Sequence, residues 1–212
     1  YHVAGVIITS GAPPLELAEE YLARKIPVTL INRHAELPGC DRVSSDNALG
    51  GKLAAELLHA GQCRDVGFIG ENRDNFSTRQ RYEGFIHHAS GLAVTAHFCE
   101  TGGYQSGFAA ARRLAAERPG LQALFCATDM LAIGAMDGLR ADNPAAVLPA
   151  IIGFDDIPQA EWQPYQLTTI QQDTTLLAYH AVEMLVSRIA KFNQPSRHRE
   201  VAVKLIIRNS AK

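Results

Sequence analysis

The feature that most constrains this chain is a regular alternation of short apolar runs with segments of helical periodicity. Such alternation is typical of βαβ units, and it predicts an α/β fold with a mostly parallel sheet. The predicted strands cover residues 5–9, 26–31, 42–45, 65–70, 93–99, 122–126, 147–152, 167–170 and 201–207. The predicted helices follow Ser10-Gly-Ala-Pro-Pro14 and cover 47–59, 76–89, 106–117, 129–140 and about 174–192. So many strands fit two hinged sheets better than one.

Composition and charge are those of an ordinary globular protein, with 47% hydrophobic residues, 20% charged residues and a net charge of −2. No apolar stretch reaches membrane-spanning length and no signal-type segment opens the chain, so we expect a cytoplasmic protein without membrane contact. No basic run provides the charge that a nucleic-acid-binding surface needs. Because the chain begins without Met and almost directly in a strand, we expect further sequence upstream.

The residue patterns of enzymes, metal sites and cofactor sites are missing from the sequence. The four cysteines, Cys40, Cys63, Cys99 and Cys126, form no CxxC pair, which argues against a zinc site and for a reducing compartment. There is no Gly-x-Ser-x-Gly elbow, no Walker loop and no dinucleotide fingerprint. We therefore expect a protein that is not an enzyme and that holds neither a metal nor a cofactor.

Two carboxylates follow the apolar run 147–152. The strand is expected to stop at Gly153-Phe154, so that Asp155 and Asp156 stand at its carboxyl end. In an open parallel sheet the loops at this edge line the ligand crevice, which makes both residues candidates for contact with a small molecule. For Asp156 the preferred alternative is a structural role, capping the turn that follows. A Mg²⁺ site on the pair is a further alternative, but a third carboxylate with matching placement is absent.

Further polar groups follow other predicted strands. Ser77 and Arg81 are four residues apart and share one face of the helix after Gly70. An arginine at this edge can fork two hydrogen bonds onto a hydroxyl pair or a carboxylate. Thr128 follows strand 122–126, where it either caps the next helix or turns its hydroxyl toward a ligand.

Three features leave alternatives open. The glycine pair Gly50-Gly51 inside a helix predicts the close approach of another backbone or of a ligand. The helix 129–140 is apolar around most of its circumference, so it lies either at a homodimer interface or between other core elements. Trp162 packs locally, contacts a partner or covers the crevice.

Several motifs, taken together and in order, resemble those of the lactose/galactose-repressor family of bacterial transcription regulators. They are Ser45-Asp-Asn47 with Gly50-Gly51, Arg81-Tyr-Glu-Gly-Phe85, the run from Ala123 to Met136, Ile152-Gly-Phe-Asp-Asp-Ile-Pro158 and Leu167-Thr-Thr-Ile-Gln-Gln172. The likeness covers nearly the whole chain. It implies a periplasmic-binding-protein-like fold of two doubly wound α/β lobes joined by three crossovers, here near Gly70, Gln171 and Gln194.

On this resemblance the N-terminal lobe comprises residues 1–70 and 171–193, and the C-terminal lobe comprises residues 71–170 and 194–212. In the family a helix-turn-helix, a hinge helix and a first strand–helix unit precede this core, and the chain begins after them. Operator DNA would therefore be bound by the missing N-terminal domain, in a homodimer. The effector would bind between the lobes and change the angle between them.

The resemblance also assigns effector-binding roles to individual residues. Arg81 and Asp155 match the family's strongest effector contacts, Ser77 matches a pocket residue one turn earlier, and Asp46 matches one at the lobe junction. The other expected contacts are Ser10, Tyr104 near the usual aromatic wall, Thr128 in place of Asn and Thr174 in place of an aromatic residue. The two threonines imply a ligand that differs from the usual one or is smaller and more polar.

These observations predict a ligand-responsive transcriptional regulator, in the first place a repressor, whose effector-binding and dimerisation core binds a small sugar or sugar acid. The alternative with the same fold is a transport-type periplasmic sugar-binding protein, which an upstream secretory signal would favour and an upstream helix-turn-helix would exclude. A metal-dependent enzyme built on Asp155-Asp156 is the second alternative. The sequence does not name the effector, the operator or the direction of regulation.

Overall fold

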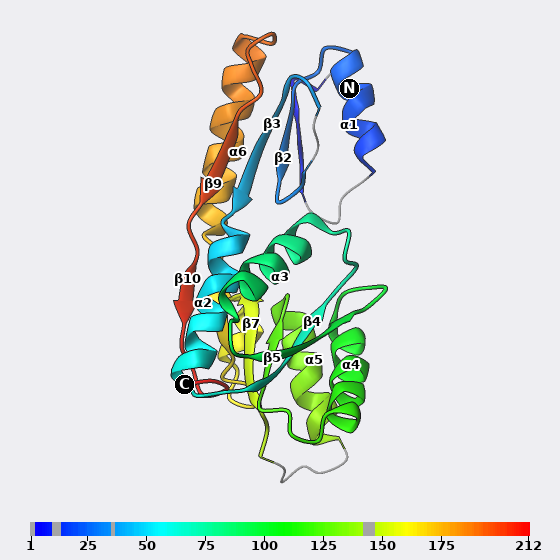
Figure 1. Ribbon diagram of the computed structural model, residues 1–212. Coiled ribbons are helices and arrows are strands. Elements are labelled where there is room, and N and C mark those ends of the chain that lie inside the picture. The colour runs from blue at the N-terminus through cyan, green and yellow to red at the C-terminus, as the bar shows by residue number, and fades with distance from the viewer. Residues whose placement is uncertain (1–2, 10–13, 35–36, 142–146) are drawn as a thin grey trace. The chain divides into compact units, whose positions relative to one another are not determined.

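The computed structural model describes residues 3–9, 14–34, 37–141 and 147–212. The chain packs into two compact units. Figure 1 shows their helices and strands, coloured by residue number. Unit 1 comprises Tyr1–Asp46 and Asp173–Ala202, and unit 2 comprises Asn47–Gln172 and Val203–Lys212. Each unit has helices packed on its own, largely parallel sheet, which confirms the predicted fold class.

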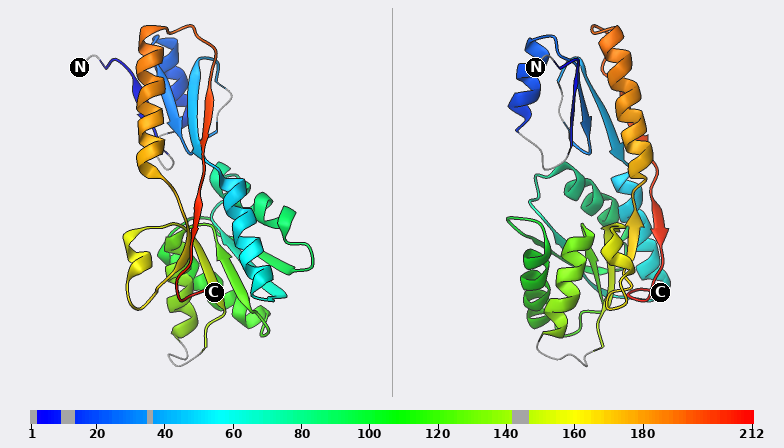
Figure 2. Two further views of the ribbon diagram at one scale, coloured as in Figure 1. Left: turned by 90° about the vertical axis from the view of Figure 1, so that its left-hand side faces the viewer. Right: turned by 180° about the vertical axis from the view of Figure 1, so that it is seen from behind.

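Unit 1 is built on a sheet of four parallel strands. Their spatial order is β1 (Val6–Ile8), β2 (Val28–Ile31), β3 (Cys40–Ser45) and β9 (His198–Val201). Helix α1 (Leu15–Ala23) packs on the face to which Leu30 points, and α6 (Thr174–Ala190) packs on the face to which Ile31 points. Figure 2 shows the strands between these two helices. Because strand side chains alternate in direction, unit 1 has two small cores.

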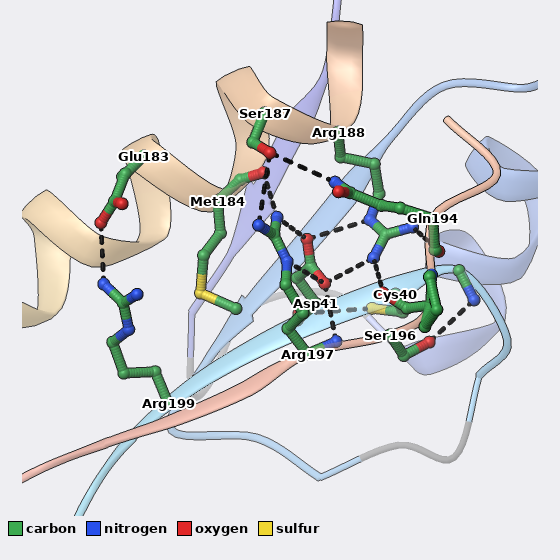
Figure 3. Close-up of polar contacts among 12 residues, drawn as sticks. Cys40, Asp41, Glu183, Met184, Ser187, Arg188, Gln194, Ser196, Arg197 and Arg199 are labelled. Atoms are coloured by element: carbon green, nitrogen blue, oxygen red, sulfur yellow. Dashed lines mark hydrogen bonds and ion pairs between the residues drawn. The ribbon is translucent and has the colours of Figure 1, made fainter. Parts of the chain in front are cut away.

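A buried ion network closes the end of unit 1 where α6 turns back into β9 (Figure 3). Arg188 and Asp41 are both fully buried, and the guanidinium donates to both carboxylate oxygens, with N–O distances of 2.6 and 2.9 Å. Arg188 also donates to the carbonyl oxygens of Gln194 and Pro195, and Arg197 donates to Asp41 at 2.8 Å. Although burial opposes ionisation of Asp41, the hydrogen bonds from the two arginines lower its pKa. The network therefore fixes the turn that brings β9 to β3.

Unit 2 is built on a six-stranded sheet that is parallel except at one edge. The spatial order is β10 (Lys204–Ile206), β8 (Thr168–Gln171), β7 (Ala150–Asp155), β6 (Ala123–Cys126), β4 (Asp65–Gly70) and β5 (Ala93–Phe98), with β10 antiparallel to β8. Four helices form two pairs, α2 (Asn47–Ala60) with α3 (Phe76–His88), and α4 (Tyr104–Glu117) with α5 (Asp129–Arg140). Phe68 of β4 packs on Phe85 of α3, whereas its neighbour Gly67 faces Leu114 of α4, so the pairs cover opposite faces of the sheet. A short 3₁₀ helix, η1 (Pro158–Glu161), follows β7.

The glycine pair in α2 allows close approach of other parts of unit 2. A Cβ atom on Gly51 would lie 2.5 Å from the backbone nitrogen of Phe85, so the backbones of α2 and α3 touch at this point. A Cβ atom on Gly50 would collide with the ring of Phe154 in β7. The glycine pair was predicted to allow the approach of either another backbone or a ligand. In the structure the backbone of α3 approaches Gly51, and the ring of Phe154 packs on Gly50.

The first crossover differs from its expected position. It was expected near Gly70, but β4, which ends at that residue, pairs with β5 and β6 inside unit 2. The chain therefore leaves unit 1 earlier, between Asp46 and Asn47. The second crossover lies between Gln172 and Asp173, directly after its expected position at Gln171.

The last predicted strand, 201–207, is in fact two strands that belong to different sheets. β9 ends at Val201 beside β3, and β10 begins at Lys204 beside β8. The third crossover therefore lies between Ala202 and Val203 rather than near Gln194. A continuous apolar run hides this break, because periodicity does not tell which sheet a strand joins.

Strand β7 runs further than expected. Gly153, Phe154 and Asp155 pair with β8, so the strand does not stop at Gly153. It ends where φ becomes positive, at 121° for Asp155 and 57° for Asp156, outside the β region. Val147, expected at the start of this strand, is instead 97% exposed.

The apolar helix α5 is a core element. It packs against α4, β6 and β7, and Leu131 has no exposed surface, which favours the sandwiched alternative over a dimer interface. Helix α6, by contrast, keeps exposed apolar side chains such as Tyr179 and Val186. Trp162 is 55% exposed, so packing inside unit 2 covers less than half of it. In the described part of the chain, no helix has the length and apolarity needed to cross a membrane.

Candidate functional site

Arg81 and Asp155 lie together at the carboxyl edge of the unit 2 sheet. Nη1 of Arg81 and Oδ1 of Asp155 are 3.6 Å apart. β4, β6 and β7 run in the same direction, so the helix that follows β4 and the residue that ends β7 meet at one edge. The side chain of Arg81 is 5% exposed and that of Asp155 is 27% exposed, which makes the carboxylate the more accessible partner.

The surroundings of Arg81 hold its guanidinium in one place. Cζ lies 3.5 Å from the centroid of the Phe154 ring, within the range of a cation–π contact. Nε donates to Oδ1 of Asn47 at 2.8 Å, and Nη1 donates to the carbonyl oxygen of Ala127 at 2.5 Å. Because Gly50 carries no side chain, the Phe154 ring has room to lie against the guanidinium. These contacts engage two of the five N–H groups that an arginine side chain carries.

Asp155 occupies a strained backbone conformation. Its φ of 121° is one that residues other than glycine rarely adopt, and Asp156 beside it is also left-handed. Such strain persists only where the surroundings fix it, and it gathers at ligand sites. Nε2 of Gln172 donates to Oδ1 of Asp155 at 2.6 Å, while Asp156 pairs with Arg208 at 2.8 Å and accepts from Gln171 at 2.7 Å. Asp156 therefore supports the turn, in line with the structural alternative for that residue.

Three carboxylates, those of Asp155, Glu71 and Asp129, lie near the guanidinium of Arg81. Burial raises the pKa of Asp155. The charge of Arg81 and the hydrogen bond from Gln172 lower this pKa, and the charge of Glu71 raises it. Burial lowers the pKa of Arg81 against the opposing effect of Asp155 and Glu71, but an arginine stays charged at neutral pH. Glu71 directly follows β4, and its carboxylate lies against Gly102. The edge thus presents more negative than positive charge to a ligand.

Ser77 and Thr128 also lie at this edge of the sheet. Ser77 is buried in the first turn of α3, one turn before the arginine. Oγ1 of Thr128 accepts the backbone N–H of Leu131 at 3.3 Å, so this residue caps α5 and still has a hydroxyl proton to donate.

Tyr104 does not join the group, contrary to expectation. It is the first residue of α4, and its hydroxyl donates to Oδ2 of Asp137 at 3.0 Å. Asp137 lies in the third turn of α5 and also accepts from Tyr165 at 2.9 Å. The phenol of Tyr104 is therefore bound to helix α5 by a partner that the sequence pattern does not reveal.

The three other predicted residues belong to unit 1. Asp46 follows β3, and its backbone nitrogen donates to the carbonyl oxygen of Val201 at 2.8 Å. Thr174 is the first residue of α6 and is exposed. Ser10 lies outside the described residues. Their roles as effector contacts stay predictions.

Four neighbours of the Arg81–Asp155 pair were not predicted as site residues: Asn47, Glu71, Phe154 and Gln172. Glu71 and Gln172 directly follow strands of the same parallel sheet, so the rule that selected Thr128 also applies to them. Phe154 precedes Asp155 in the same motif and contacts the guanidinium from strand β7, but the sequence does not tell which helix its ring faces.

The described residues do not contain a group of three or more His, Cys, Asp or Glu side chains placed to hold a metal ion. Asp155 and Asp156 also contact different partners, Gln172 and Arg208. The carboxylate pair is therefore not arranged as a Mg²⁺ site.

Burial raises the pKa of the Cys40 thiol to about 11, which keeps this sulfur protonated at neutral pH.

Sequence comparisons agree with this architecture. Residues 54–211 match the family model described as the periplasmic binding protein-like domain. The HTH-type transcriptional repressor PurR of Actinobacillus pleuropneumoniae serotype 5b (strain L20) is 27% identical over 192 residues, which cover 88% of this chain and 57% of that protein. The ribose operon repressor of Halalkalibacterium halodurans is also 27% identical, over 100% of this chain and 63% of that protein. The chain thus spans about three-fifths of the length of these curated relatives.

A solved structure leads to the same conclusion. The complex of the transcriptional regulator CelR with cellobiose has a TM-score of 0.87 and 26% sequence identity, covering 99% of this chain and 66% of that one. The family model covers most of the present chain, including both Arg81 and Asp155. The chain therefore belongs to the periplasmic-binding-protein-like domain family, and the predicted resemblance to lactose/galactose-repressor regulators is confirmed.

Proposed function

We propose that this chain is the effector-binding core of a ligand-responsive transcriptional repressor. The observation that carries the proposal is the buried guanidinium of Arg81 beside the carboxylate of Asp155 at the carboxyl edge of a parallel sheet. A fixed group of donors next to a partly exposed acceptor suits a ligand that both donates and accepts hydrogen bonds. Adjacent hydroxyl groups of a sugar do both.

The charge at this edge favours an uncharged sugar over a sugar acid. Asp155 and Glu71 provide two carboxylates and the buried Asp129 provides a third, whereas Arg81 provides one guanidinium. A ligand carboxylate would gain a bond from the arginine and would also face two like charges in a partly buried place. A neutral sugar gains charge-assisted bonds worth about 1.5–3 kcal/mol each without that repulsion. Contacts from Ser10, Asp46 and Thr174 of unit 1 are part of the proposal.

Regulation follows from ligand affinity. An effector shifts an equilibrium between two conformations only by the difference in its affinity for them. We infer that operator DNA is bound by a helix-turn-helix outside this chain, as the names of the relatives suggest. The proposed homodimer rests on the family resemblance, since α5 is covered by its neighbours. A cytoplasmic location belongs to the same proposal.

The alternative is a transport-type binding protein with the same fold. The relatives named as repressors and the CelR complex with cellobiose favour the regulator. The Arg81–Asp155 pair does not distinguish a regulator from a transport protein, because either would bind a sugar through the same contacts. The ligand test therefore addresses the site, and DNA binding by the full-length protein addresses the role.

The experiment is isothermal titration calorimetry with D-ribose, D-glucose, D-galactose and cellobiose. Arg81→Ala and Asp155→Asn are each expected to abolish binding of the sugar that the native chain binds. Arg113→Ala is the matched control, because Arg113 is an exposed arginine of α4 paired with Glu117. Circular dichroism melts verify folding. Unchanged affinity in either site variant would refute the site.

A further inference from the structure

A second carboxylate lies beneath the loop that carries Asp155. Asp129 is the first residue of α5 and has no exposed surface. Its Oδ2 accepts the backbone N–H of Ile157 at 2.9 Å, and its Oδ1 accepts the hydroxyl of Thr169 at 2.5 Å. One side chain thus connects α5, β8 and the segment that follows β7.

The two ends of the strained segment both depend on this side chain. Ile157 follows Asp155 and Asp156, the two residues with positive φ. On the other side, a side chain at Gly153 would collide with Oδ1 of Asp129, so the carboxylate fills the space that Gly153 leaves open. A positive φ at a non-glycine residue persists only when its surroundings fix it. Asp129 provides this restraint from below the segment.

We propose that Asp129 is a positioning residue for the effector site, holding the segment 153–157 so that the Asp155 carboxylate stays beside Arg81. The inference rests on the proposed function of the Arg81–Asp155 pair. Asp129 itself is fully buried, so it acts on the ligand only through the loop.

Protonation of Asp129 makes the role testable, because a purely structural role would not make effector affinity depend on the ionisation of this side chain. Burial raises its pKa to about 7, the bonds from Thr169 and Ile157 lower it, and Asp155 and Asp156 raise it. Several charged or titratable groups face Asp129 from the elements packed around it. They are Arg81 of α3, Cys126 of β6, and Asp155 and Asp156 at the end of β7, where Asp156 is paired with Arg208.

The ionised carboxylate accepts both hydrogen bonds. Protonation turns one of its oxygens into a donor, which competes with the Ile157 N–H or the Thr169 hydroxyl. The loop then loses one restraint. Effector affinity is therefore expected to fall as the pH drops through about 7.

The test measures the dissociation constant of the sugar identified in the calorimetric panel between about pH 6 and pH 8. The native chain is expected to bind more weakly at the lower pH. Asp129→Asn, which keeps the size but offers one acceptor oxygen, is expected to bind about tenfold more weakly at pH 8 and to lose the pH dependence. Thr169→Val removes one donor and is expected to move the midpoint to higher pH, since the Thr169 bond lowers the pKa of Asp129.

Asp137→Asn is the matched control. Asp137 is on the same helix and also accepts two side-chain hydrogen bonds, from Tyr104 and Tyr165. This variant is expected to keep the native affinity and pH profile. Hydrogen exchange of the Ile157 amide gives a second readout, and it is expected to be faster in Asp129→Asn.

The outcomes separate the two proposals. If the native chain binds no sugar of the panel, the proposed function fails and the role of Asp129 in it fails as well. If a sugar binds in the way that Arg81 and Asp155 require, but folded Asp129→Asn matches the native chain in affinity, pH profile and Ile157 exchange, the inference about Asp129 alone is overturned.

Discussion

Arg81 lies with its Cζ 3.5 Å from the ring centroid of Phe154, and the next residue, Asp155, approaches the same guanidinium to 3.6 Å. Side chains of consecutive strand residues ordinarily point to opposite faces of a sheet. Two consecutive residues of β7 reach one guanidinium here because φ of Asp155 is 121°. The strained backbone is therefore part of how the site is built.

Backbone strain at Asp155 predicts that glycine is more stabilising than alanine at this position, the reverse of the usual order in a strand. Asp155→Gly and Asp155→Ala lose the same carboxylate contacts, and at a φ of 121° the ease of adopting the native backbone conformation outweighs the greater freedom of glycine in the unfolded chain. The glycine variant is expected to be the more stable of the two by about 1 kcal/mol in urea unfolding. Ala96→Gly in β5 is the control at an ordinary strand position, where glycine is expected to destabilise. An alanine variant at 155 as stable as the glycine variant would contradict the strain.

Charge discrimination at the site predicts the behaviour of Glu71→Gln. Removing this carboxylate reduces the repulsion of an acidic ligand and leaves Arg81 and Asp155 in place. The ratio of D-galacturonate affinity to D-galactose affinity is expected to rise about threefold to tenfold, measured by calorimetry at low salt. Glu100→Gln, on the exposed loop after β5, is the control. A native chain that prefers the acid to the neutral sugar would show that the charge argument is wrong.

The buried network of unit 1 predicts a large loss of stability on removal of its carboxylate. Asp41→Ala leaves the fully buried guanidinium of Arg188 without a counter-charge, which is expected to lower the free energy of unfolding by about 3–5 kcal/mol. Glu183→Ala removes the carboxylate of an exposed pair with Arg199 and is expected to change stability little. Equal effects of the two substitutions would mean that burial does not decide the outcome.

The pKa of Asp129 predicts how the stability of unit 2 depends on pH. A carboxyl whose folded pKa is raised to about 7 binds its proton more tightly in the folded state than in the unfolded chain. Its contribution to stability is complete below the unfolded pKa and is lost as the pH rises through about 7. The native chain is expected to become less stable from about pH 5 to pH 8 in urea titrations, and Asp129→Asn is expected to remove that part of the decline. A decline of the same size in the variant would assign it to another group.

Much of the fold could be predicted because strand–helix alternation is a local property. Helix α5 and strand β4 have their predicted bounds, 129–140 and 65–70. The assignment of residues to the two units could not be predicted in the same way. It is decided by which strand pairs with which, as the division of the run 201–207 between two sheets shows.

The site was predicted to the extent that it follows from the direction of the strands. Parallel strands bring their carboxyl ends together, and this rule predicts that Arg81 and Asp155 lie at one edge, as the structure has them. It does not tell where a side chain points. Tyr104 is bound to Asp137, more than thirty positions later in the chain, and no local pattern around either residue indicates that bond.

The break between β9 and β10 has a consequence for the order in which the molecule can assemble. Unit 1 begins the chain, yet α6 and β9, which complete it, are synthesised after nearly all of unit 2. The strands β1, β2 and β3 are synthesised long before α6, which covers one of their faces, whereas unit 2 then lacks residues 203–212, which include its antiparallel edge strand. Premature termination before Asp173 would leave bare the apolar face of β1, β2 and β3 that α6 covers, so nascent unit 1 depends on the later synthesis of α6 and β9 to become a stable body.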